Sequence, residues 1–212
     1  MSFYWKGKMI KTEKISFATH FVAALLSFCG AVFLAVFAKK TEWKIISIIY
    51  GFTITFLFSS SALYHATKKT ENSNSFFRKL DHFAIFVMIA GSYTPVCYMF
   101  LDGAWMISIL TVQWSLVLIG GFVKFFSVGK SRKLSTAIYL IMGWLLLIPM
   151  KKILIVIPKF QFVFLLGEGA AFSIGAAFYL VRKPVRLFHE IFHVFCVIGA
   201  AFHYTAVLLA VI

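Results

Sequence analysis

Long apolar runs without charge, separated by short clusters of charged residues, constrain the fold of this 212-residue chain most strongly. Seven runs are long enough to cross a lipid bilayer, because a membrane-spanning helix needs about 20 mostly apolar residues. We therefore expect an all-α membrane protein, a seven-transmembrane-helix bundle that forms one domain over residues 1–212. The expected spans are residues 16–38, 44–66, 82–101, 104–124, 134–150, 160–181 and 187–212.

The composition supports a membrane fold and excludes several soluble classes. Apolar residues make up 61% of the chain and charged residues only 13%, whereas soluble domains carry about 25% charged residues. Seven spans leave about 65 residues for loops and tails, which is too few for a soluble domain, a nucleotide fold or a nucleic-acid module. We expect membrane lipids as partners, with no nucleic acid and no obligate protein partner.

The basic residues predict how the bundle is oriented. Of the 21 Lys and Arg residues, fifteen fall in the N-terminal tail and in the loops after the second, fourth and sixth runs. Because Lys and Arg concentrate on the cytoplasmic side, we expect a cytoplasmic N-terminus and an external C-terminus in the cell membrane. The net charge of +14 then faces anionic lipid.

Ionisable residues from three runs meet at the predicted cytoplasmic boundary. His65 ends the second run and Asp81 begins the third. His189 and His193 begin the seventh run on the same side. One polar residue near a helix end is usually an interfacial anchor, but a charge inside a span costs about 2.5–3.5 kcal/mol. Four such groups at one depth therefore indicate a shared site.

The spacing of the histidines predicts a metal site. His189 and His193 are four residues apart, which places them on one face of a helix, about 6 Å apart along its axis. With His65 they supply three imidazoles, which leaves an open position on a tetrahedral zinc ion, as in catalytic sites. Asp81 is our first choice for the group that orients water and takes its proton. Ser61 shares a helix face with His65.

The stretch that contains the two paired histidines also reads HExxH, the zinc-protease signature, with Glu190 as the general base. The downstream candidate for a third ligand, His203, lies about 15 Å further along the helix, too far for the same ion. We therefore favour His65 as the third ligand and treat Glu190 as a competitor of Asp81. Intramembrane proteolysis is a minor alternative.

These residues together resemble the hemolysin III family, and through it the progestin and adipoQ receptor family of the CREST membrane-hydrolase superfamily. The resemblance covers nearly the whole chain and includes seven spans with the N-terminus on the cytoplasmic side. The matching pieces are Ser61-Ala-Leu-Tyr-His65, Lys79-Leu-Asp-His-Phe-Ala-Ile85 with Ala90-Gly-Ser-Tyr-Thr-Pro95, and His189-Glu-Ile-Phe-His193.

The resemblance implies a zinc (Zn2+) site near the cytoplasmic face with His65, His189 and His193 as ligands. It implies that Asp81 holds the zinc-bound water and that Ser61 either supports the metal ligands or assists the transition state. Because the superfamily includes ceramidase-like amide hydrolases, the resemblance suggests hydrolysis of an amide or ester bond in a lipid-like substrate. The apolar interior would hold its acyl chain.

Two alternative functions stay open. A lipid receptor or sensor would hold zinc for structure only and would consume no lipid. A cytolysin or channel would need a continuous polar path through the bundle, and the polar residues inside the runs are sparse. They include Thr53, Thr55, Ser59, Ser60, Ser61 and Glu168.

Three further ionisable residues lie in or beside the runs. His20, in the first run, and His82, beside Asp81, are expected to make interfacial hydrogen bonds; the alternative for either is a position beside the metal ligands, where it would orient them. Glu168 lies about 12 Å inside the sixth run. An intramembrane carboxylate is either functional or bonded to a neighbouring helix, and we expect Glu168 not to touch the metal.

Overall fold

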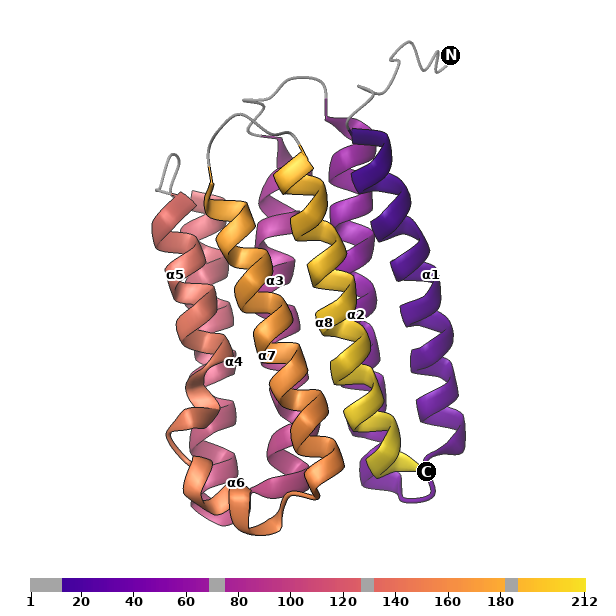
Figure 1. The fold of residues 1–212 in the computed structure, drawn as a ribbon, viewed down its shortest axis with the longest axis vertical. Coiled ribbons are helices and arrows are strands. Elements are labelled where there is room, and N and C mark those ends of the chain that lie inside the picture. The colour runs from indigo at the N-terminus through magenta and orange to yellow at the C-terminus, as the bar shows by residue number, and fades with distance from the viewer. Residues whose placement is uncertain (1–12, 69–74, 127–131, 182–186) are drawn as a thin grey trace.

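Six long helices form an upright bundle (Figure 1). The computed structural model describes residues 13–68, 75–126, 132–181 and 187–212, which contain helices and no strand. Each of the six is long and apolar enough to cross a membrane, where a helix satisfies its own backbone groups. The predicted all-α, multi-span fold is confirmed. The six are α1 (Glu13–Phe37), α2 (Thr41–Thr67), α3 (Phe76–Phe100), α4 (Gly103–Phe126), α7 (Lys159–Leu180) and α8 (Leu187–Val211).

The fifth predicted span, 134–150, is broken. α5 (Arg132–Gly143), a 3-10 turn (Leu145–Leu147) and α6 (Met150–Val156) follow one another, and the segment bends by 53° before α6. Pro149 explains the break, because proline has no backbone N–H with which to continue a helix. The described residues thus contain six spanning helices, or seven spans if the bent pair counts as one.

Side chains of α3 and α4 satisfy the backbone at this break. The Tyr93 hydroxyl donates to the carbonyl of Gly143 at 2.8 Å and accepts from the N–H of Leu146 at 3.2 Å. The Gln113 amide donates to the carbonyl of Met142 at 2.8 Å. Because an unpaired backbone group is costly in a membrane, these bonds allow an irregular turn inside the bundle.

The described chain begins and ends at opposite ends of the bundle. α1 and α8 both begin at the upper end in Figure 1, and the C-terminus lies at the lower end. There Lys39 donates to the carbonyl of Ile212 at 3.3 Å. The choice of cytoplasmic end stays a prediction from the basic residues. Several of these lie outside the described residues, namely Lys6, Lys8, Lys11, Lys69, Lys130, Arg182, Lys183 and Arg186.

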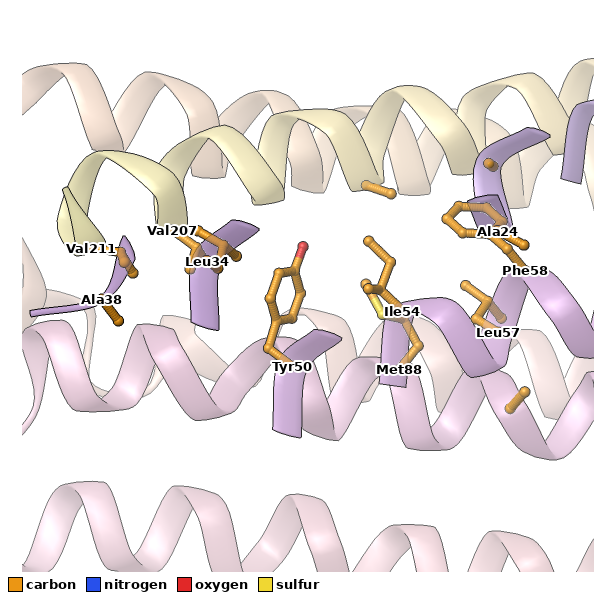
Figure 2. Packing of buried hydrophobic residues seen from close by; sticks show 13 residues of the cluster. Ala24, Leu34, Ala38, Tyr50, Ile54, Leu57, Phe58, Met88, Val207 and Val211 are labelled. Carbon is orange, nitrogen blue, oxygen red and sulfur yellow. The ribbon is translucent and has the colours of Figure 1, made fainter. Parts of the chain in front are cut away.

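An apolar core joins α1, α2, α3 and α8. Figure 2 shows Leu34, Tyr50 and Val207 in this core, all fully buried. The helices approach closely where side chains are small: a β-carbon at Gly91 would lie 2.0 Å from the Thr53 hydroxyl oxygen. Such small-residue contacts are typical of helix packing in membranes. The core thereby fixes α1, α2 and α8 relative to one another, which positions the site described next.

Candidate metal centre

Three histidines from two helices meet at the upper end of the bundle. His65 lies in the last turn of α2, and His189 and His193 lie in the first two turns of α8. Their ligand nitrogens all lie within 4.8 Å of one another. His65 and His193 are buried, and His189 is half-buried. The structure therefore brings together the three residues that the sequence suggested as ligands.

One pair of these nitrogens has the spacing of two ligands on a tetrahedral ion. The Nε2 atoms of His189 and His193 are 3.1 Å apart. Two ligands of a tetrahedral zinc ion, at Zn–N distances of about 2.0–2.1 Å, are about 3.3 Å apart. The rings of His65 and His193 face each other edge-on, with 4.7 Å between their centroids. Three imidazoles thus surround one small volume.

Glu13 holds His65 from the far side of the cluster. Glu13 is the first residue of α1 and is only 7% exposed. Its Oε2 lies 2.5 Å from Nδ1 of His65. Lys68 donates to the other carboxylate oxygen at 2.7 Å. A carboxylate on Nδ1 favours the tautomer with its proton there, which leaves Nε2 of His65 available as a ligand.

Sequence reasoning missed Glu13. The signal that was present is a single acidic residue in an otherwise basic tail, at the point where the first apolar run begins. Nothing in that pattern names His65 as its partner, because α1 and α2 must first pack. Glu13 is therefore a site residue that only the tertiary structure identifies.

His20 holds His193 in a similar way. Nε2 of His20 lies 2.7 Å from Nδ1 of His193, and the ring centroids are 4.0 Å apart. His20 is 3% exposed, so the expected interfacial hydrogen bond is replaced by a buried contact with the cluster. Because Nδ1 of His193 is engaged by His20, its Nε2 remains directed toward His189.

Asp81 and Ser61 line the cavity beside the histidines. Oδ2 of the half-buried Asp81 lies 3.4 Å from Nδ1 of His82. The same nitrogen of His82 lies 2.8 Å from the Arg78 carbonyl, one turn earlier in α3. The buried Ser61 hydroxyl lies close to the Asp81 carboxylate but makes no well-formed hydrogen bond with any described group. Ser61 and Asp81 can therefore both reach a molecule in the cavity.

The second candidate base and the downstream histidine lie at different places. Glu190 is half-buried and lines the cavity, so geometry does not separate it from Asp81 as a base. His203 instead pairs with Glu168, whose Oε2 lies 2.7 Å from its Nδ1. His203 is therefore not part of the three-histidine cluster.

A cavity of about 1210 Å³ connects these residues. Its lining includes Lys68 and Arg78 near the upper end and Ile157 and Phe162 near the lower end. Ligand pockets usually measure about 300–1,000 Å³. The cavity is thus large enough for a long apolar molecule with one polar end.

Comparison with known proteins gives consistent matches over nearly the whole chain. The model of a protein family described as Haemolysin-III related matches residues 8–204. A protein named Hemolysin-3 homolog, from Bacillus subtilis (strain 168), is 37% identical over 204 residues, 94% of each chain. A protein named Hemolysin-3, from Bacillus cereus, is 32% identical over 208 residues, which cover 97% of this chain and 94% of the relative. No solved structure matches this chain.

Proposed function

This chain belongs to the haemolysin III family, and we propose that it is a zinc-dependent membrane hydrolase that cleaves an amide or ester bond in a lipid-like substrate. It is a multi-pass integral membrane protein, and the cell membrane is where we expect it. The observation that carries the proposal is the cluster of His65, His189 and His193, with ligand nitrogens within 4.8 Å of one another.

The donor set fits zinc. Three neutral imidazoles with an open fourth position form a known type of catalytic zinc site. The outer nitrogens of His65 and His193 are engaged by Glu13 and His20. Metal-binding histidines are usually oriented by such a contact on the other ring nitrogen. Both contacts support a metal-binding role over simple burial of polar side chains.

The residues around the cluster suit hydrolysis of a carbonyl compound. Zinc supplies Lewis acidity, which polarises a carbonyl group and makes water acidic enough to react near neutral pH. Asp81 lines the cavity and can accept the proton of the attacking water. The Ser61 hydroxyl, on the same cavity, can donate a hydrogen bond to the oxyanion that forms. The apolar part of the cavity would hold the acyl chain.

Metal analysis of the purified protein tests the site. We expect about one zinc ion per chain in the wild type and almost none in a His189→Ala/His193→Ala double variant, which keeps only one of three ligands. Glu190→Gln, between the two histidines, is the matched control and should keep its metal. Equal metal content in the wild type and the double variant would refute the site.

Lipid turnover tests the reaction. The wild type and a His65→Ala variant are incubated with N-acyl amide and ester lipids in detergent micelles, and the released fatty acid is measured by mass spectrometry. We expect release by the wild type only, and its loss after treatment with a chelator. Bound zinc without consumption of any lipid would favour the receptor or sensor with structural zinc instead.

Cytolysis is the second candidate function, because the two relatives carry the name Hemolysin-3. A cytolysin releases dye from liposomes without chemistry at the histidines. Dye release that persists in the His65→Ala variant would favour it. Dye release that is absent from the wild type would exclude it.

A further inference from the structure

A second polar cluster lies on the same cavity, away from the metal centre. Glu168 of α7 and His203 of α8 both line this cavity, with Oε2 of the glutamate 2.7 Å from Nδ1 of the histidine. His203 follows His193 by ten residues on α8, which is about 15 Å along the helix axis. The pair is therefore too far from the three histidines to share an ion with them.

The second ring nitrogen of His203 is buried without a partner. His203 is 1% exposed, and its Nε2 makes no hydrogen bond with any described group. Tyr50 packs against the ring with centroids 5.0 Å apart, and its buried hydroxyl also makes no hydrogen bond with a described residue. In Figure 2 this hydroxyl points from α2 toward α8. A buried polar atom without a partner destabilises the fold, so the retention of His203 on the cavity points to a ligand for its Nε2.

A purely structural role does not explain the pair. α7 and α8 already pack through apolar contacts, such as Phe178 on Phe195 with ring centroids 5.9 Å apart. Gly199 lets the Phe172 ring approach within 3.0 Å of its β-carbon position. An added carboxylate and imidazole inside the membrane are costly. The two helices would therefore stay together without them.

The chemistry of the pair selects a hydroxyl group. The Glu168 carboxylate accepts the hydrogen bond from Nδ1–H of His203, so Nε2 presents a lone pair when the ring is neutral and an N–H when it is protonated. A hydroxyl pairs with Nε2 in either state, because it both donates and accepts. A saturated acyl chain has no group that can do so.

We propose that Glu168 and His203 form a second binding subsite, which takes a hydroxyl group on the chain of a lipid-like ligand. The position of the ligand's carbonyl end at the three histidines rests on the proposed function. The hydroxyl then lies roughly 15 Å from the carbonyl, the axial separation of the two sites on α8. The cavity would thereby prefer hydroxylated acyl chains over plain chains of equal length.

Two fatty acids of equal length test the subsite. Dodecanoic acid and 12-hydroxydodecanoic acid are titrated into the purified wild type in detergent, and their dissociation constants are measured by calorimetry. We expect the hydroxylated acid to bind about tenfold more tightly, the effect of one hydrogen bond to a buried polar pair. Equal dissociation constants in the wild type would overturn the subsite.

A double variant separates this contact from general cavity binding. Glu168→Leu/His203→Phe removes both polar groups together, so no buried charge is left unpaired. We expect the preference for the hydroxylated acid to disappear while dodecanoic acid still binds. A double variant that keeps the preference contradicts the proposal. If this variant does not fold, Glu168→Gln, which keeps an acceptor for Nδ1 but loses the charge, should show a reduced preference.

The test separates the subsite from the proposed function, because neither titration needs turnover. A wild type that lacks zinc and still prefers the hydroxylated acid contradicts the hydrolase and supports the subsite. A wild type that binds zinc and does not distinguish the two acids contradicts the subsite alone.

Discussion

At the scale of single residues, α1 orients the candidate metal ligands. Glu13 and His20 lie two turns apart on this helix and therefore on one face. Each contacts Nδ1 of a different cluster histidine, Glu13 that of His65 and His20 that of His193. Because these contacts occupy the outer nitrogens, the inner ones turn toward one another. α1 thus orients a site to which it supplies no ligand of its own.

Removing the charge of Glu13 should weaken metal binding without removing a ligand. We expect Glu13→Gln to lower zinc affinity about 10–100-fold, the usual effect of losing a group that orients a metal-binding histidine. Competition with a fluorescent zinc chelator measures this affinity. Glu42→Gln, the same change in the exposed first turn of α2, is the control and should bind like the wild type. Unchanged affinity in Glu13→Gln would show that Glu13 does not orient His65.

The three clustered histidines could be predicted from the sequence, whereas the contact of Glu13 with His65 could not. His189 and His193 share a helix face by their spacing alone, and the adjacent basic residues place His65 at the same depth. The contact between His20 and His193 depends on how α1 and α8 are rotated about their axes. An apolar run of nearly uniform hydrophobicity contains no signal for that rotation.

At the scale of elements, apolar runs predicted where the chain is helical but not the 3-10 turn inside the fifth span. The run 134–150 combines α5, the 3-10 turn and the start of α6. Hydrophobicity indicates how many residues can lie in lipid. The path of the backbone depends instead on which side chains form hydrogen bonds with its N–H and C=O groups. Here Tyr93 and Gln113, from α3 and α4, do so.

Removing the Tyr93 hydroxyl should destabilise this irregular turn. Tyr93→Phe takes one partner from the Gly143 carbonyl and one from the Leu146 N–H. We expect a loss of about 1–3 kcal/mol in the free energy of unfolding, the cost of leaving buried polar groups unpaired. Denaturant unfolding in detergent measures it. Tyr98→Phe, the same change at an exposed position of α3, is the control. Equal stability of the two variants would show that the Tyr93 hydroxyl does not stabilise the break.

At the scale of the whole molecule, the metal centre and the start of α1 share one end of the bundle. The basic residues predict that this end faces the cytoplasm, because fifteen of 21 Lys and Arg fall on its side. The C-terminus lies at the other end, where the Lys39 ammonium donates a hydrogen bond to the carbonyl of Ile212. Under the proposed function, the orientation of the bundle decides which compartment supplies zinc and which receives the polar product.

Cysteine labelling in intact cells tests this orientation. Glu42→Cys, in the exposed first turn of α2 at the lower end, should react with a membrane-impermeant thiol reagent in intact cells. Lys133→Cys, at the exposed start of α5 at the upper end, should react only after permeabilisation. The wild type corrects for its native Cys29, Cys97 and Cys196, which lie within helices. The opposite pattern would place the three histidines on the external side and would contradict the orientation that the positive-inside bias predicts. The lysines at the lower end, and not those at the upper end, would then face the anionic inner leaflet.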